Sequence, residues 1–438
     1  MSPIYAVGAI ISGVLLLQGG MGLLTAVLPL RMNEAGFTSS EIGIMSAGFS
    51  AGFLLGCIYA PHLIGRIGHI RAFSAFATVL SAMTLAFAID TDLFLWTGAR
   101  LVSGVCFAGL LNVSDSWISG ETDKSVRGRV MSVYMILYKI AQASGPLVLT
   151  FATISGNWHF MLVSALFSLS LLPVALRHGG QPVLPSKDRM HVWDVYKTTP
   201  LAVVGSICLG MSNSPINNLM PLYAVEVGIG IAGAAILSSA LQLGALALQW
   251  PMGWASDKRD RRQVMIFGMA GVAVFSAIIA FLPPMPVWGY APLIFILGGF
   301  AMSVYPVLLA HAGDFVEPKQ MVPLCATLML AFSFGMTIGP ITAAAAMDLV
   351  GPNGLFLHSI LFCCLFIVFA LYRMTRRRAP VGEARRAYVN VPASSTAISE
   401  LDPRAHPDVE ESIEEAFGHD PDDPDAGDEI PHYRPSTK

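Results

Sequence analysis

Two long apolar runs joined by a short charged loop decide the fold of this chain. Residues 233–281 read GAAILSSALQLGALALQWPMGWASDKRDRRQVMIFGMAGVAVFSAIIAF. Each run is long enough to cross the hydrocarbon of a bilayer as a helix, which takes about 20 apolar residues. The loop between them, residues 257–262, consists entirely of charged residues. This stretch predicts two membrane-spanning helices joined by a tight loop at the water interface.

The same pattern extends over most of the 438 residues. Similar apolar runs begin near Ile4, Ile42, Ala72, Leu93, Gly128, Trp158, Thr198, Gly233, Val264, Trp288, Met321 and Leu355. The Pro-rich stretch 283–286 is predicted to be the short loop between the ninth and tenth spans. We therefore expect an all-α integral membrane protein with twelve transmembrane helices.

The composition agrees with this prediction. Hydrophobic residues make up 54% of the chain and charged residues 13%, and the mean hydropathy is +0.62. An average soluble domain has about 25% charged residues, so an ordinary water-facing surface is excluded. No basic stripe is large enough for a phosphate backbone, so we expect no nucleic acid as partner. The lipid bilayer is the expected environment.

Lys and Arg residues are distributed unevenly between the loops. Eighteen of them follow the even-numbered spans, and one, Arg31, lies in the other loops. Because cytoplasmic loops carry the excess of positive charge, both termini are predicted to be cytoplasmic. The expected location is the cell inner (plasma) membrane, which the chain crosses many times.

The body of the chain contains an internal repeat. Leu28-Pro29-Leu30 and Glu34-Ala35-Gly36 align with Met220-Pro221-Leu222 and Glu226-Val227-Gly228 at a shift of 192 residues. Six spans repeated in the same orientation indicate a duplication about an axis along the membrane normal. We predict an N-terminal six-helix bundle (1–176), a cytoplasmic linker (177–197), a C-terminal six-helix bundle (198–378) and a disordered acidic cytoplasmic tail (379–438).

The loop after span eight carries a specific motif. Residues 253–262, GWASDKRDRR, resemble the G-x-x-x-D-K/R-x-G-R-R signature of the major facilitator superfamily, with Asp260 where the family usually has Gly. The loop after span two is a degraded copy with Gly65 in place of the acid, and Arg100 and Gly104 are similar to the R-x-x-x-G motif. The resemblance covers residues 1–378 and is closest to poorly characterised bacterial permeases. It implies two pseudo-symmetric six-helix bundles in the major facilitator fold, with spans 1, 4, 7 and 10 around a central cavity.

The resemblance also implies that the loop motif acts in gating. The residues concerned are Gly253, Asp257, Lys258, Arg261 and Arg262, with Arg66 and Gly68 in the first half. Asp257 can accept hydrogen bonds from an arginine or from the N-terminus of a neighbouring helix, which would hold the cytoplasmic side shut. For the arginines, positive-inside topology alone is the alternative explanation.

Small residues in spans two and eleven indicate close helix packing. Spans two and eleven carry GxxxG units, which are formed by Gly48, Gly52 and Gly56 and by Gly335 and Gly339. Because the resemblance places the two spans opposite each other across the halves, these glycines either let the spans slide or serve in static packing.

Charged side chains inside spans are costly and therefore functional candidates. Arg100 lies in span four and Lys139 near the middle of span five, one turn from Gln142. Asp115, near the inner end of span four, is the predicted proton carrier, because a partly buried carboxyl can bind and release protons near neutral pH. The alternatives are a structural ion pair or snorkelling for Lys139 and an interfacial cap for Asp115.

Polar residues in spans seven and ten complete the candidates. Asn213 and Asn217 are four residues apart, so they share one helix face and can hydrogen-bond a polar solute. Tyr305 and His311 lie in span ten, His311 near the cytoplasmic end. The alternatives are hydrogen bonds between helices for the asparagines and an interfacial position for His311.

Together these features predict a secondary active transporter that moves a small polar or anionic metabolite by alternating access, coupled to protons. No Walker A motif, metal-ligand spacing or catalytic constellation is present, so we expect no cofactor, no metal and no enzyme activity. We also expect a monomer, with the acidic tail open to a cytoplasmic partner. Two other functions remain open, a multidrug efflux permease and a non-transporting membrane sensor or scaffold that acts through the tail.

Overall fold

The computed structural model describes residues 3–122, 127–151, 154–175, 191–317 and 320–376, in which every regular element is a helix. The first half contains α1 (Pro3–Glu34), α2 (Ser39–Ile67), α3 (His69–Ala86), α4 (Leu93–Glu121), α5 (Arg127–Leu147), the 3₁₀ turn η1 (Val148–Thr150), α6 (Trp158–Leu169) and α7 (Leu171–Ala175). After the short helix α8 (Val192–Thr198), the second half contains α9 (Pro200–Glu226), α10 (Gly230–Lys258), α11 (Arg261–Phe281), α12 (Val287–Gly313), α13 (Met321–Val350) and α14 (Gly354–Arg376). The predicted tail and most of the predicted linker lie outside the described residues.

The predicted spans agree with these helices. Each span begins within three residues of its predicted start, if α6 and α7 are taken together as one span. Within the described residues, nine helices are long and apolar enough to cross a membrane by length and composition alone. The long helices α5 and α9 are not among them, because α5 carries Lys139 and α9 carries three asparagines. The most polar spans are therefore also the candidates for a site.

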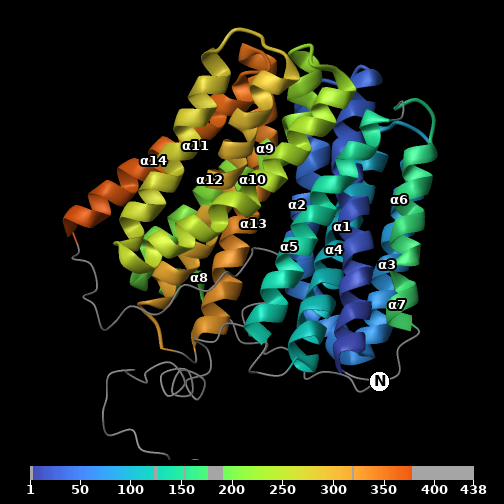
Figure 1. Cartoon of the computed structure of the whole chain (residues 1–438), viewed down its shortest axis with the longest axis horizontal. Coiled ribbons are helices and arrows are strands. Elements are labelled where there is room, and N and C mark those ends of the chain that lie inside the picture. Colours follow the sequence, from blue (N-terminus) through green and yellow to red (C-terminus); the bar gives the residue numbers. More distant parts are fainter. Residues whose placement is uncertain (1–2, 123–126, 152–153, 176–190, 318–319, 377–438) are drawn as a thin grey trace, which may run out of the picture.

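The helices form two bundles that repeat the same pairings (Figure 1). In the first bundle α2 packs on α4, α1 on α5 and α3 on α6. In the second bundle α10 packs on α12, α9 on α13 and α11 on α14, which are the equivalent pairs. The most extensive contacts between the bundles are those of α2 with α13 and of α5 with α10, and α1 also contacts α9. The fold is therefore the predicted pair of pseudo-symmetric six-helix bundles.

The ends of α1 and α9 show the repeat in the backbone. Both helices end at the aligned glutamates, and a glycine in the left-handed region follows each, with φ of 83° at Gly36 and 82° at Gly228. The N–H of the residue after each glycine donates to a carbonyl five residues earlier, as in a Schellman motif. The shift of 192 residues thus relates equivalent positions of the two bundles.

Glycines let the paired helices within each bundle approach closely. A Cβ atom on Gly52 of α2 would lie 1.9 Å from the carbonyl oxygen of Leu101 in α4. Conversely, a Cβ on Gly104 of α4 would lie 2.1 Å from the carbonyl oxygen of Phe49 in α2. The same reciprocal contact joins three other helix pairs, through Gly22 and Gly145, Gly210 and Gly335, and Gly244 and Gly298. Close backbone contacts at these glycines therefore hold the paired helices of each bundle together.

The glycines in the GxxxG units of α2 and α13 serve this internal packing. Those of α2 face α4, and those of α13 face α9. These glycines therefore do not form the contact between α2 and α13 through which the two spans were expected to slide; they pack inside their own bundles. The close approach between α2 and α13 occurs instead at Gly43, where a Cβ would lie 2.6 Å from the carbonyl oxygen of Pro340.

Substitution of one reciprocal glycine tests this packing. We expect Gly52→Ala to lower the free energy of unfolding by about 1–3 kcal/mol, because its methyl group overlaps the backbone of α4. Unfolding of the purified protein in mixed micelles measures this change. Gly98→Ala in α4 is the matched control, since a Cβ there meets nothing within 4 Å. Equal stability of the two variants would contradict the packing argument.

Candidate functional site

A cavity of about 230 Å³ lies between the two bundles. Helices α1, α2, α4 and α5 line it from the first bundle, and α9, α10, α12 and α13 line it from the second. The four helices that the family resemblance implied, α1, α4, α9 and α12, are all among them. Each bundle thus contributes the same four equivalent helices to the wall.

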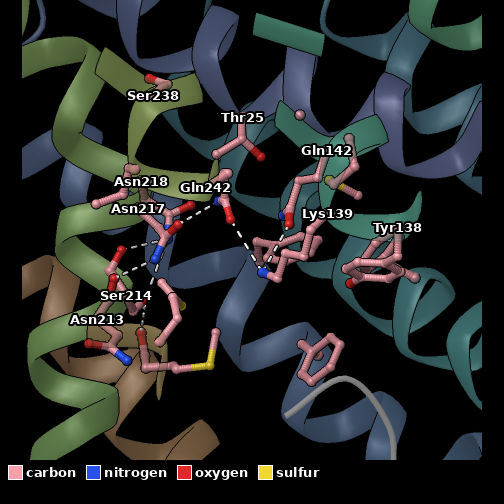
Figure 2. A pocket seen from close by; sticks show the side chains of 18 of the residues that line it. Thr25, Tyr138, Lys139, Gln142, Asn213, Ser214, Asn217, Asn218, Ser238 and Gln242 are labelled. Atoms are coloured by element: carbon pink, nitrogen blue, oxygen red, sulfur yellow. Dashed lines mark hydrogen bonds between the residues drawn. The ribbon is translucent and has the colours of Figure 1, made fainter. Parts of the chain in front are cut away.

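A row of polar side chains crosses this cavity from one bundle to the other (Figure 2). The ammonium Nζ of Lys139 in α5 donates to Oε1 of Gln142 and to Oε1 of Gln242 in α10, each at 3.3 Å. Nε2 of Gln242 donates to Oδ1 of Asn217 in α9 at 2.8 Å. The side chain of Asn217 in turn donates to the carbonyl oxygen of Asn213 at 2.9 Å. Hydrogen bonds therefore connect α5, α10 and α9 across the interface.

Asn213 takes part in packing between helices as well as in the row. Its side-chain amide donates to the carbonyl oxygen of Ala301 in α12 at 2.8 Å. Its Oδ1 is buried and has no hydrogen-bond partner in the described part of the chain. Ser214 beside it donates to the carbonyl oxygen of Met336 in α13 at 3.0 Å. This end of the row is therefore fixed to two neighbouring helices.

Aromatic side chains form much of the remaining wall. In the first bundle the ring of Phe49 lies 6.4 Å from that of Phe53 and 5.9 Å from that of Phe107, between ring centroids. In the second bundle the rings of Tyr305 and Phe332 are 4.9 Å apart. The predicted residue Tyr305 thus belongs to the aromatic lining, to which both bundles contribute.

Lys139 is the one charged side chain among the described residues that line the cavity. An ammonium group has three N–H donors, and two of them bind the amide oxygens of Gln142 and Gln242. Neither partner carries a negative charge. The cavity therefore has an uncompensated positive charge between its two halves.

Arg100 and Asp115 lie behind the wall of the cavity, within the first bundle. The guanidinium of Arg100 is 2% exposed and stacks on Phe49, with Cζ 4.2 Å from the ring centroid. Asp115 is fully buried and accepts a hydrogen bond from the hydroxyl of Tyr134 at 3.0 Å. The ring of Tyr134 packs against that of Tyr138, which lines the cavity. Two tyrosines thus separate Asp115 from the cavity.

His311 also lies away from the cavity, near the end of α12. It is buried, its ring contacts Phe315 at 5.2 Å between centroids, and its charged neighbours are Asp260, Arg261 and Arg262. The structure therefore groups His311 with the loop after α10 and not with the substrate site to which the sequence assigned it.

Arg261 joins the ends of three helices at this loop. At the start of α11, its Nη1 donates to the carbonyl oxygen of Ala310 at 2.7 Å and to Oδ1 of Asp314 at 2.5 Å, both near the end of α12. Its Nη2 lies 3.8 Å from Oδ1 of Asp257 in the last turn of α10. Within the described part of the chain, these contacts all brace the second bundle.

Asp260, where the family signature has Gly, has a clear structural role. Its carboxylate accepts from the backbone N–H of Arg262 at 3.0 Å and pairs with the Arg262 guanidinium at 2.8 Å. Burial raises the pKa of Asp260, but the hydrogen bonds and charge of Arg262 outweigh this effect and hold the pKa below its usual value. Asp260 is therefore the N-cap of α11.

The other residues of the predicted gating loops have simpler surroundings. Nζ of Lys258 lies 4.4 Å from the ring centroid of Trp254, and the carbonyl oxygen of Gly253 accepts from Ser256 at 2.8 Å. Arg66 is exposed, and Gly68 has φ of 85° at the turn between α2 and α3.

Sequence reasoning missed a cluster at the opposite end of the helices. The backbone N–H groups of Ser39 and Ser40, at the start of α2, donate to Asp348 at 3.1 and 2.9 Å, and the Ser40 hydroxyl also donates to this carboxylate. The Ser39 hydroxyl donates to Glu226 at 3.2 Å. A carboxylate is stabilised at a helix N-terminus by the exposed N–H groups and the helix dipole. We call Ser39, Ser40, Glu226 and Asp348 the α2 clamp, because they fix α2 to the last turns of α9 and α13.

Comparison with known proteins agrees with this architecture. The family model described as Major Facilitator Superfamily matches residues 10–199 and 202–406. The uncharacterized MFS-type transporter YcaD of Salmonella typhi is 26% identical over 376 residues, which are 85% of this chain and 97% of the relative. YcaD of Salmonella newport gives the same identity and coverage.

Solved transporters share the fold at low sequence identity. The nucleoside transporter NupG has a TM-score of 0.69 at 14% identity, with 86% of this chain and 99% of NupG covered. A bacterial homolog of the human lysosomal transporter Spinster, in an inward-facing and occupied conformation, has a TM-score of 0.69 at 16% identity, with 86% of this chain and 98% of that chain covered. These likenesses concern the fold alone.

Two neutralising substitutions compare the carboxylates that contact Arg261. We expect Asp314→Asn to lower the free energy of unfolding by about 3–5 kcal/mol, because it removes the buried partner of a buried arginine. Asp257→Asn should change it by less than about 1 kcal/mol, because the Asp257 side chain is 43% exposed. Unfolding in mixed micelles measures both, and a larger effect at Asp257 would contradict this assignment.

Proposed function

The chain belongs to the major facilitator superfamily. We propose that it is a secondary active transporter of the inner membrane that moves a small polar or anionic solute by alternating access. The observation that carries the proposal is the polar row at Lys139, which joins the two bundles inside a cavity. A solute bound there touches both bundles at once. Binding can therefore change how the bundles sit relative to each other.

The α2 clamp supports an assignment of the conformation. By the distribution of Lys and Arg, the turn at Gly36 faces outward and the loop 257–262 faces the cytoplasm. The clamp and the close contact at Gly43 then close the outer end. We assign this conformation as inward-facing. In the outward-facing conformation, the residues of the α2 clamp must move apart.

The cavity favours a small polar or anionic solute over the lipophilic cations expected of a multidrug exporter. Its volume of about 230 Å³ lies below the range of about 300–1,000 Å³ that drug-sized ligands occupy. Its charged lining side chain within the described residues is a lysine, which repels cations. Multidrug efflux is therefore the weaker candidate.

Asp115 remains our proposed proton carrier. Its carboxylate is buried, and Tyr134 and Tyr138 lie between it and the cavity beside Lys139. Hydroxyl groups and waters in such a path can pass a proton between the carboxyl and a solute site.

Reconstitution tests the proposed function directly. Thermal-shift screening of the purified protein against metabolites identifies a solute, whose entry into proteoliposomes is then followed with and without a pH gradient. We expect saturable flux that the gradient drives uphill. A protein that binds the solute but shows neither net flux nor counterflow would exclude transport and favour the sensor function.

Neutralising the clamp should open the outer end. In Asp348→Asn, the side-chain amide accepts hydrogen bonds from the two backbone N–H groups less well than the carboxylate does. The accessibility of the cavity is measured in intact cells by labelling of a cysteine introduced as Ser238→Cys with an impermeant maleimide. We expect this labelling to rise several-fold when Asp348→Asn is added. Asp92→Asn is the matched control, because Asp92 caps α4 within one bundle. Labelling that does not change in Asp348→Asn would contradict the clamp assignment.

Removing the buried acid should uncouple transport from protons. We expect Asp115→Asn to abolish uphill uptake driven by a pH gradient and to retain counterflow, because solute exchange needs no net proton movement. Asp194→Asn, at an exposed site in α8, should behave as wild type. If Asp115→Asn matched wild type at every pH and gradient, Asp115 would not be the carrier.

A further inference from the structure

The uncompensated charge of Lys139 indicates what the cavity binds. Its two hydrogen-bond acceptors are neutral amide oxygens, and the described residues of the cavity wall include no carboxylate. A cation held between membrane helices is costly unless an opposite charge neutralises it. Because the wall offers no such charge, the solute is the natural source of the counterion.

The groups around Lys139 suit one carboxylate. The ammonium keeps one N–H that neither glutamine uses. Nε2 of Gln142 makes no hydrogen bond within the described residues, and this side chain also lines the cavity. An ammonium N–H and an amide N–H on the same wall can each donate to one oxygen of a carboxylate.

The rest of the wall suits an apolar body on that carboxylate. Phe49, Phe53 and Phe107 from the first bundle and Tyr305 and Phe332 from the second present aromatic surfaces. Methionines 21, 135, 302 and 336 complete this lining, and thioether side chains adapt to apolar ligands of different shape. A purely hydrophilic anion would leave these surfaces in contact with water.

Among the described residues that line the cavity, no second cation is available for another negative charge on the solute. The nearby cation in the first bundle, Arg100, is 2% exposed and lies behind the ring of Phe49. A dianion would therefore bury one charge that no side chain neutralises.

We propose that the cavity binds a small organic monocarboxylate, with its carboxylate on Lys139 and Gln142 and its apolar body against the aromatic side chains of the lining. This substrate class deepens the proposed transport function and rests on it only for movement across the membrane.

Matched probes test the proposed class by equilibrium binding to the full chain in detergent. The series consists of monocarboxylates with bodies of increasing size, from acetate to 3-phenylpropanoate, each measured beside its own amide and amine, with glutarate as the dianion. We expect affinity to rise with the apolar body and to fall at least roughly tenfold from acid to amide, amine or dianion. Equal binding of acid and amide, preference for the amine or glutarate, or no binding by any monocarboxylate would overturn the proposal.

Three substitutions, one at Gln142 and two at Lys139, test the charge itself. Gln142→Glu has the shape of the native residue and places a carboxylate next to the ammonium, so it should abolish monocarboxylate binding while the protein remains folded. Lys139→Gln should do the same, and Lys139→Arg should restore part of the binding. Gln320→Glu makes the same chemical change at the exposed N-cap of α13 and should bind as wild type. Full binding by Gln142→Glu would overturn the proposal.

Counterflow in proteoliposomes separates this proposal from the transport function. Binding of 3-phenylpropanoate that depends on Lys139, without counterflow, would support the site and exclude transport. Flux of a neutral or cationic solute that Lys139→Gln leaves intact would support transport and overturn the monocarboxylate class.

Discussion

Contact between helix backbones at reciprocal glycines is the constraint on which the rest of the structure depends. Four helix pairs, two in each bundle, touch where neither helix has a side chain to separate them. Such contacts are lost if the helices shift by even one side-chain width, so we expect each bundle to move as a unit in the proposed transport cycle. The contacts between the bundles lie elsewhere, chiefly between α2 and α13 and between α5 and α10, with a smaller one between α1 and α9. The polar row and the α2 clamp lie at these interfaces.

The charged groups of the described chain also fall into two classes, those that lie within one bundle and those that lie between the bundles. The Arg261 network fixes helix ends inside the second bundle, whereas Lys139 and Asp348 each make hydrogen bonds from one bundle to the other. Groups inside a bundle stabilise it, and groups between bundles are the ones that a conformational change must rearrange. The position of a charged side chain, within one bundle or between the two, therefore indicates whether it stabilises a bundle or takes part in a conformational change.

Much of this architecture could be predicted from the sequence. Apolar run lengths gave the helix starts, and the match between Gly36 and Gly228 gave the repeat, because both depend on local sequence. The partners of Lys139 and Asp348 could not be predicted, since each depends on how two distant helices align. The same reason explains why the glycines of α2 were assigned to the wrong neighbour. A capping box formed by Thr38 and Glu41 marks the start of α2, but nothing local indicates that Asp348 lies opposite it.

Hydration of the polar groups at the start of α2 depends on whether the α2 clamp is closed. Two backbone N–H groups of its first turn rest on a carboxylate from the other bundle, and separation of the bundles leaves both groups and the carboxylate to be hydrated. The two conformations of the proposed transport cycle are therefore expected to differ in the number of bound waters at this end. Osmolytes that lower water activity should favour the closed clamp. Osmotic pressure should therefore shift the equilibrium between the conformations.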